Sequence, residues 1–143
     1  KFPSLSNVQL ILWRTVLSAA ILNFYLNLNF YPDLLQYQSG SQAAIYANKH
    51  FRDVPVVQLR KEYSYALEFY LHAPLITVDS VAEINVLPDA PFLLYVPTKT
   101  FSDSTATTVQ RFEHFPVSRL DGKFINFKTR RNVIGTFQLD LIK

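Results

Sequence analysis

The chain has 143 residues, of which 49% are hydrophobic and only 17% are charged; this length and composition suit one folded domain and exclude a disordered chain. Cysteine is absent and only three glycines occur, which excludes disulfides, thiolate zinc sites and glycine-rich phosphate-binding loops. The net charge of +3 is too small to predict a nucleic-acid partner.

An apolar run from Val8 to Tyr31 predicts a long helix near the start of the chain. Ser6 or Asn7 is the expected N-cap, and Pro32 is expected to end the helix. The run has the length needed to cross a bilayer and contains one basic residue and no acidic residue. We therefore predict that this helix is a membrane span.

Aromatic residues lie toward both ends of this run, at Trp13, Tyr25 and Tyr31, as they do in spans whose ends meet the membrane interface. The alternative is a long amphipathic helix of a soluble domain, with Arg14 and Asn23 on its solvent-facing side. Asparagines are costly in hydrocarbon, so they favour this alternative.

The expected domain organisation has two parts, an apolar helix over residues 1–31 and a soluble α/β domain over residues 32–143. Methionine is absent, and Lys1 leads directly into the apolar run. We therefore expect these residues to be the end of a longer chain, with residues 1–31 as its last transmembrane span.

After Pro32, changes in hydrophobic period predict alternating helices and strands. Following a break at Ser39-Gly40-Ser41, the expected helices are Gln42–Phe51, Glu62–His72, Val81–Asn85 and one that is capped by Ser102 or Asp103 and ends at Phe112. The expected strands are Val54–Leu59, Leu75–Val78, Phe92–Val96, Val117–Leu120, Lys123–Lys128 and Thr136–Ile142, with a hairpin turn at Asp121-Gly122. This order predicts a mixed sheet flanked by helices in a three-layer sandwich, preceded by the long apolar helix.

Residues capable of catalysis or metal binding are scattered along the chain. His50, His72 and His114 lie near predicted helix ends without a metal-binding spacing, and we interpret His50 and His72 as helix C-terminal caps. Hydroxyl residues cluster around Asp103, but no Gly-x-Ser-x-Gly motif surrounds them, and a Ser/His/Asp set would have to recruit His114. We predict no catalytic residue, no metal site and no cofactor in this chain.

The densest positive charge lies near the C-terminus. It consists of Lys123, Lys128, Arg130 and Arg131, with Phe124 and Phe127 between them. Arginine and lysine side chains in such a cluster bind phosphate, which predicts a site for phosphate or an anionic lipid. The alternative is a solvated hairpin whose apolar residues face the core.

Two segments resemble a family of bacterial membrane enzymes. The sequence FYPDLLQYQSGSQAA at residues 30–44 resembles the exit from the last span in multi-pass glycosyltransferases that use a lipid-carried sugar. These enzymes are related to dolichyl-phosphate-mannose protein mannosyltransferases and to the aminoarabinose transferase of lipid A. The sequence YSYALEFYL at residues 63–71 is similar to a recurring helix of that family.

The resemblance implies a C-terminal domain on the periplasmic side of the bacterial inner membrane. Its partners would be the membrane, the upstream membrane body of the parent enzyme and a lipid-linked sugar phosphate. The family's catalytic acid lies in an early extracytoplasmic loop outside these residues, so no catalytic position is carried over. The alternative function is a soluble interaction module, or a module that binds an anionic ligand, without enzymatic activity.

Overall fold

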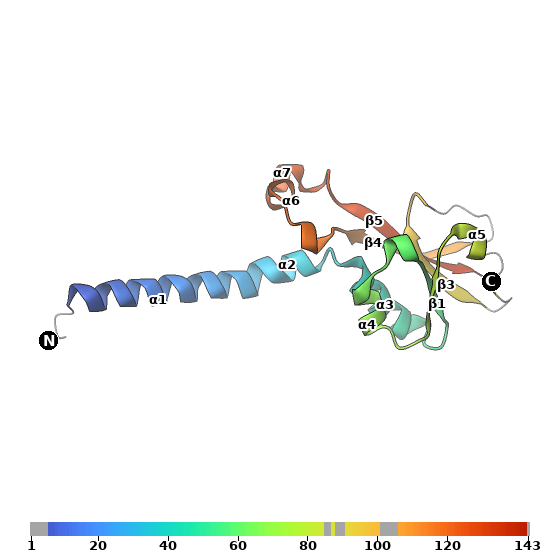
Figure 1. Cartoon of the computed structure of the whole chain (residues 1–143), viewed down its shortest axis with the longest axis horizontal. Coiled ribbons are helices and arrows are strands. Elements are labelled where there is room, and N and C mark those ends of the chain that lie inside the picture. The colour runs from blue at the N-terminus through green and yellow to red at the C-terminus, as the bar shows by residue number, and fades with distance from the viewer. Residues whose placement is uncertain (1–5, 85–86, 88–90, 101–105, 143) are drawn as a thin grey trace. The chain divides into compact units, whose positions relative to one another are not determined.

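The structure is a computed structural model of the chain, described here for residues 6–84, 87, 91–100 and 106–142. It divides into two compact units, residues 1–35 and 36–143, and each is described by itself. The first is a single apolar helical segment, and the second is an α/β domain (Figure 1).

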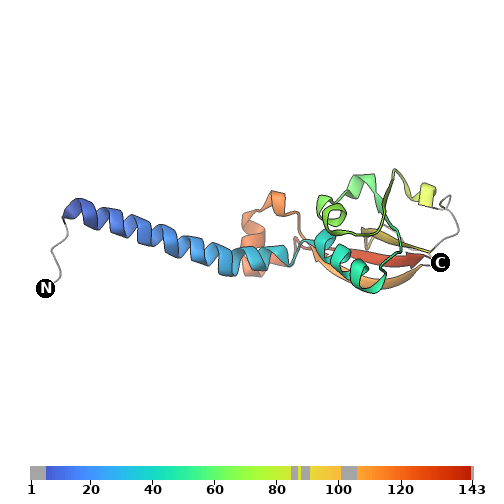
Figure 2. The same ribbon diagram turned by 90° about the horizontal axis from the view of Figure 1, so that it is seen from below.

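The helical segment consists of α1 (Asn7–Tyr25), a π-helical turn (Leu26–Phe30) and α2 (Tyr31–Leu35). Figures 1 and 2 show these parts as one continuous helix. Ser6 caps α1, as expected. Its hydroxyl accepts a hydrogen bond from the Gln9 N–H, and the Gln9 side chain accepts one from the Ser6 N–H in return.

The expectation that Pro32 ends the helix is wrong, because α2 continues beyond it to Leu35. A proline lacks an N–H, and its ring clashes with the carbonyl four residues earlier in a regular α-helix. The π-helical turn lies directly before this proline, and the Tyr31 N–H donates to the Leu26 carbonyl five residues back. The wider turn gives the proline ring room without breaking the helix.

The domain is built on a five-stranded mixed sheet in the order β2-β1-β3-β5-β4. The strands are β1 (Val56–Leu59), β2 (Leu75–Val78), β3 (Phe92–Pro97), β4 (Thr107–His114) and β5 (Gly135–Ile142). β1 pairs in parallel with β2 and β3, whereas β5 pairs antiparallel with β3 and β4. The predicted α/β class is therefore confirmed, and the apolar β3 lies at the sheet centre as such a run predicts.

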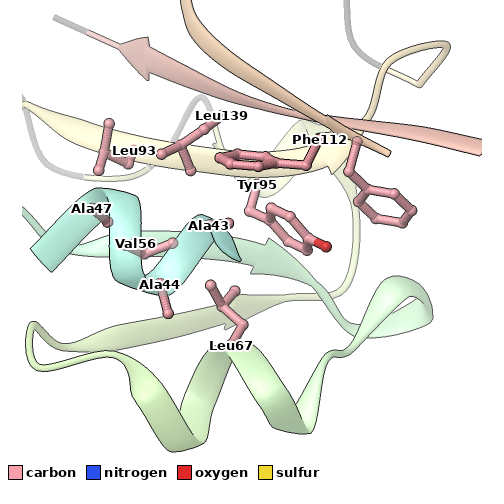
Figure 3. Close-up of a cluster of buried hydrophobic side chains, with 10 residues drawn as sticks. Ala43, Ala44, Ala47, Val56, Leu67, Leu93, Tyr95, Phe112 and Leu139 are labelled. Atoms are coloured by element: carbon pink, nitrogen blue, oxygen red, sulfur yellow. The ribbon is translucent and has the colours of Figure 1, made fainter. Parts of the chain in front are cut away.

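Helices cover the two faces of the sheet unequally. α3 (Ser39–His50) and α4 (Tyr65–Tyr70) cover one face, where Figure 3 shows small side chains of α3 and Leu67 of α4 meeting the strands. The short α5 (Val81–Ile84) packs on the other face through Ile84. Because both faces bury apolar side chains, the strands alternate between two cores and the sheet forms the middle layer.

Two elements near the first of these cores differ from their predicted bounds. α3 begins at Ser39, so Ser39 and Gly40 lie inside the helix and are buried, where a break was expected. α4 is shorter than the predicted Glu62–His72, because a 3₁₀ turn (Arg60–Glu62) precedes it and the Ser64 hydroxyl caps it at the Leu67 N–H.

The predicted helix ending at Phe112 is wrong, because the described part of that segment is the strand β4. The proposed caps Ser102 and Asp103 lie outside the described residues. Thr107, Thr108 and Val109 are β-branched and favour a strand, and β5 supplies the hydrogen-bonding partner along β4. Only Phe112 of this edge strand is fully buried, which gives the segment a weak hydrophobic period.

The predicted strands Val117–Leu120 and Lys123–Lys128 are also wrong. The structure has a 3₁₀ turn (Val117–Arg119) followed by α6 (Gly122–Ile125) and α7 (Phe127–Arg130). A hairpin turn was expected at Asp121-Gly122. The type I′ turn that an Asp-Gly pair favours requires positive φ at both residues, and no described residue has a positive φ. The Asp121 side chain instead accepts a hydrogen bond from the Phe124 N–H and caps α6.

The close approach of α3 and α4 depends on a glycine, and this generates the first prediction. A Cβ at Gly40 would lie 2.0 Å from the Ser64 Oγ and 3.1 Å from the Leu67 nitrogen, the two atoms that form the cap of α4. Although alanine favours a helix by about 1 kcal/mol over glycine, Gly40→Ala should lower the free energy of unfolding by about 1–3 kcal/mol through overpacking.

Urea unfolding followed by the near-ultraviolet circular dichroism of the tyrosines measures this effect. Gly122→Ala is the matched control, because a Cβ at Gly122 meets no atom within 4 Å, and it should change stability by less than about 0.5 kcal/mol. Equal midpoints for the two variants would contradict the proposed steric role of Gly40.

Candidate functional site

The predicted anion-binding residues lie on a pair of short helices, α6 and α7, at residues 121–131, which we call the basic hairpin. Asn126 separates the helices and caps α7 by accepting a hydrogen bond from the Lys128 N–H at 3.0 Å. The Thr129 hydroxyl donates to the Lys123 carbonyl at 2.7 Å. These side-chain bonds hold the two helices in one arrangement, in place of the predicted β-hairpin.

Arg130 is half-buried and holds the basic hairpin together. Its Nε donates to the Phe124 carbonyl at 2.8 Å. Its guanidinium lies 4.6 Å from the Phe124 ring centroid and 4.5 Å from the Phe127 ring centroid, which is a cation–π distance. Arg130 therefore positions both aromatic rings from between them.

The other three predicted cations, Lys123, Lys128 and Arg131, are exposed. Exposed apolar side chains lie between them, because Phe127 is 80% exposed and Ile125 is 53% exposed. This mixture differs from a solvated basic surface, which keeps apolar side chains inside. The structure thus brings the four predicted residues onto one small element, where one cation is structural and three face solvent.

The basic hairpin is fixed to the domain through aromatic packing. Phe124 is buried, and its ring stacks on that of Phe115 at 4.0 Å and meets the edge of Tyr37 at 5.2 Å. The Phe115 N–H donates to the Tyr37 carbonyl at 2.9 Å. The hairpin is therefore anchored beside Tyr37, which is the second residue of the domain.

A buried polar network joins α3 to two strands, and no local sequence signal indicates it. The Ser39 Oγ lies 2.5 Å from the Tyr95 hydroxyl and 2.7 Å from the His114 Nδ1. Ser39 and Tyr95 are fully buried. Burial raises the pKa of Tyr95 despite its hydrogen bond to Ser39, and burial lowers the pKa of His114.

This network is structural and not catalytic in form. Ser39 is 0% exposed, so its hydroxyl is out of reach of a substrate. The hydroxyl bonds Tyr95 and His114, and neither bond brings in a carboxylate that could orient the histidine. With His114 neutral, Tyr95 donates to Ser39 and Ser39 donates to the His114 Nδ1, which satisfies both hydroxyl protons and the Nδ1 acceptor. The serine–histidine pair therefore ties three elements of the fold together.

The remaining histidines have simpler environments. His50 lies in the last turn of α3, as predicted for a C-terminal cap. His72 lies after the end of α4, and its N–H donates to the Asn48 Oδ1 at 2.9 Å. Among the described residues, no group of three His, Asp or Glu side chains is placed to hold a metal ion.

Apart from the basic hairpin, a cationic hollow lies at one end of the sheet, with a volume of ≈ 460 Å³. Lys99 and Arg111 line it together with Thr98 and Thr136, and the sequence analysis did not single out the two cations. Both cations are exposed, so water competes for any anion bound there.

The sequence analysis also did not identify one buried acid, Asp140. It lies on β5 opposite Leu94, is 1% exposed, and accepts a hydrogen bond from the Gln138 Nε2 at 2.6 Å. Its other oxygen, Oδ1, has no hydrogen-bond partner among the residues that the structure describes. A buried carboxylate with an unpaired oxygen costs stability.

The helix Asn7–Leu35 is the candidate membrane segment among the described residues. It has 29 residues, is apolar enough to cross a membrane, and has an apolar window of which 0% is buried. These properties suit a membrane anchor or a signal sequence.

Comparisons with known proteins give no relative for this chain. No protein-family model, curated protein or solved structure matches it significantly.

The lowered pKa of His114 predicts a loss of stability in mild acid. As the pH falls below about 6.5, the unfolded chain takes up a proton on this histidine before the folded chain does. The free energy of unfolding should therefore be retained above that pH and should fall below it. Protonated Nδ1 becomes a donor to the Ser39 Oγ, so Ser39 must donate to the Tyr95 hydroxyl oxygen, and the Tyr95 O–H then loses its acceptor within this network.

Urea unfolding between neutral pH and pH 5 measures this dependence, with His114→Gln as the test variant and His72→Gln as the matched control. His114→Gln should flatten the decline in stability, whereas His72→Gln should preserve it. An unchanged slope in His114→Gln would show that other groups cause the decline.

Proposed function

We propose that this chain is a non-catalytic extracytoplasmic domain of a membrane glycosyltransferase that transfers a sugar from a polyprenyl-phosphate donor. The helix Asn7–Leu35 serves as the last membrane span, and the α/β domain lies on the periplasmic side of the bacterial inner membrane. The observation that carries the membrane part of the proposal is the unburied apolar surface of this helix. The glycosyltransferase part rests on the resemblance of residues 30–44 and 63–71.

The distribution of apolar side chains favours a membrane span over an amphipathic helix. Exposed apolar residues surround the axis of α1 on every side, and none of its residues is buried. A surface helix of a soluble protein keeps one polar face, whereas a helix that is apolar all round requires an apolar environment. Hydrocarbon provides that environment along the whole helix.

Polar side chains within the helix are compatible with this reading. The Asn27 Nδ2 donates to the Asn23 carbonyl at 2.8 Å and to its Oδ1 at 3.0 Å, and the Thr15 hydroxyl donates to the Ile11 carbonyl. Intrahelical bonds of this kind reduce the cost of polar groups in lipid. Arg14 lies about two turns from the helix start, where a long side chain reaches the headgroups.

The absence of a catalytic arrangement among the described residues supports an accessory role. The buried serine–histidine pair is inaccessible to substrate, and no metal-binding group is present in this part of the chain. Such a domain would cover the active-site cavity of the parent enzyme or help to position the lipid phosphate or the acceptor.

A second candidate function is an anionic-ligand or interaction module without a membrane span, and the basic hairpin favours it. In that case the helix would pack on its own domain or on a partner chain, and a chain that is a monodisperse monomer in water without detergent would support this candidate. The behaviour of α1 in membranes discriminates between the two candidates.

The third prediction tests the membrane span. The chain should remain in phosphatidylcholine vesicles after alkaline extraction, because α1 buries its apolar surface in the bilayer. Arginine at the centre of an inserted helix costs roughly 2.5–3.5 kcal/mol per residue, so the double variant Leu17→Arg and Ile21→Arg should be extracted. Ile45→Arg is the matched control, because Ile45 is exposed to a similar degree on α3 of the domain, and it should stay in the vesicles.

Extraction of the unmodified chain would favour the second candidate. The glycosyltransferase part has its own test: the 143-residue chain alone should not transfer sugar from a polyprenyl-phosphate donor. In the intact enzyme that the resemblance implies, deletion of residues 36–143 should lower transfer without loss from the membrane. Robust turnover by the chain alone, or full transfer after the deletion, would overturn this part.

A further inference from the structure

The positive charge of the chain is concentrated around the basic hairpin. Residues 115–139 contain five of the 14 basic residues and one of the 11 acidic residues, so the rest of the chain has nine bases against ten acids. The single acid in this segment, Asp121, is engaged as the cap of α6. This part of the surface therefore attracts anions, whereas the remaining chain has almost no net charge.

The same element exposes large apolar side chains. Phe127 is 80% exposed although its ring lies against the Arg130 guanidinium, and Ile125 is 53% exposed. Arg131 is the C-cap of α7 and keeps the helical backbone conformation, so it follows Phe127 by about one helical turn. Exposed aromatic and aliphatic side chains among lysine and arginine are typical of surfaces that lie in the interface of an anionic membrane.

Hydrogen bonds and aromatic packing hold the hairpin in one arrangement, which lowers the entropy cost of presenting these side chains. Arg130 bonds the Phe124 carbonyl, Thr129 bonds the Lys123 carbonyl, and Phe124 is buried against Phe115. A preorganised surface loses less entropy on binding than a disordered basic segment. Phe127 is therefore exposed on an element that hydrogen bonds and packing hold in place.

The structure assigns the basic hairpin as a docking surface for an anionic lipid bilayer. Phe127 and Ile125 insert at the level of the headgroups, and Lys123, Lys128 and Arg131 pair with lipid phosphates. This inference rests on the proposed membrane span, because the hairpin packs on Tyr37, two residues after the helix ends at Leu35. Only Gln36 separates Leu35 from Tyr37 in the sequence. If the chain leaves the bilayer at Leu35, this short connection allows the hairpin to reach the headgroups.

The absence of cysteine allows a direct test with a single label. The full chain is placed in nanodiscs of phosphatidylcholine, or of phosphatidylcholine mixed with phosphatidylglycerol. Phe127→Cys carries an environment-sensitive fluorophore, and Phe69→Cys on α4 is the matched control, since Phe69 is also 80% exposed. In the anionic nanodiscs the label at 127 should shift to the blue and be quenched several-fold more by brominated lipid than the label at 69.

Three further experiments test whether the label responds to anionic lipid and not to a small anion. Lys123→Gln, Lys128→Gln and Arg131→Gln combined should abolish the shift at 127, and added sodium chloride should reduce it. Ile125→Cys gives a second label position that keeps Phe127, in case the first variant unfolds. Release by inorganic phosphate beyond that by chloride of equal ionic strength would indicate a small-anion site and overturn the assignment.

The outcomes separate this inference from the proposed span. A label at 127 that stays in water while the chain remains in the anionic nanodisc would overturn the docking surface alone. Loss of the chain from nanodiscs of both compositions would contradict the membrane span itself.

Discussion

The apolar surface of the helix Asn7–Leu35 is the constraint on which the rest of the interpretation depends. Its side chains face outward on every side and none in α1 is buried, so water is an unfavourable environment for the whole length. The π-helical turn before Pro32 contributes to the length of this apolar helix. It keeps the helix continuous past a residue that would otherwise break it, and so extends the helix to 29 residues.

Within the domain, the position of α3 depends on contacts that tolerate little change. Small residues bring α3 close to the sheet and to α4, and Ser39 at the start of α3 forms hydrogen bonds with Tyr95 and His114. Buried polar groups are costly unless every partner is present, so this network specifies where the helix begins. Burial also lowers the pKa of His114 and so favours the neutral imidazole that accepts from Ser39.

The sequence predicted those elements whose signals are local. The continuous apolar run at Phe92–Val96 indicated a central strand, and Leu75–Val78 matched its strand residue for residue. β4 was missed because its strand character comes from pairing with β5 and only Phe112 is fully buried. Asp121-Gly122 is equally suited to a tight turn and to a helix cap, and tertiary packing of Phe124 decides between them.

In the candidate site, too, local features were predicted from the sequence and long-range contacts were not. The four cations were predicted from their density in the sequence, because clustered charge needs no fold to be recognised. That Arg130 is structural depends on where Phe124 and Phe127 lie, and the partnership of Ser39 with His114 spans 75 residues. No periodicity or motif records a contact of that sequence separation, so only the folded structure shows it.

The proposed docking of the basic hairpin on a membrane depends on the tether that the helix provides. Three cations near an anionic surface contribute roughly 1 kcal/mol each, which corresponds to a dissociation constant weaker than about 1 mM. That electrostatic attraction alone would not hold a free domain on a membrane. For a domain already tethered by a membrane span, docking is intramolecular and the effective concentration is high. A weak, salt-sensitive contact is then sufficient to orient the domain, and it can release without detaching the chain.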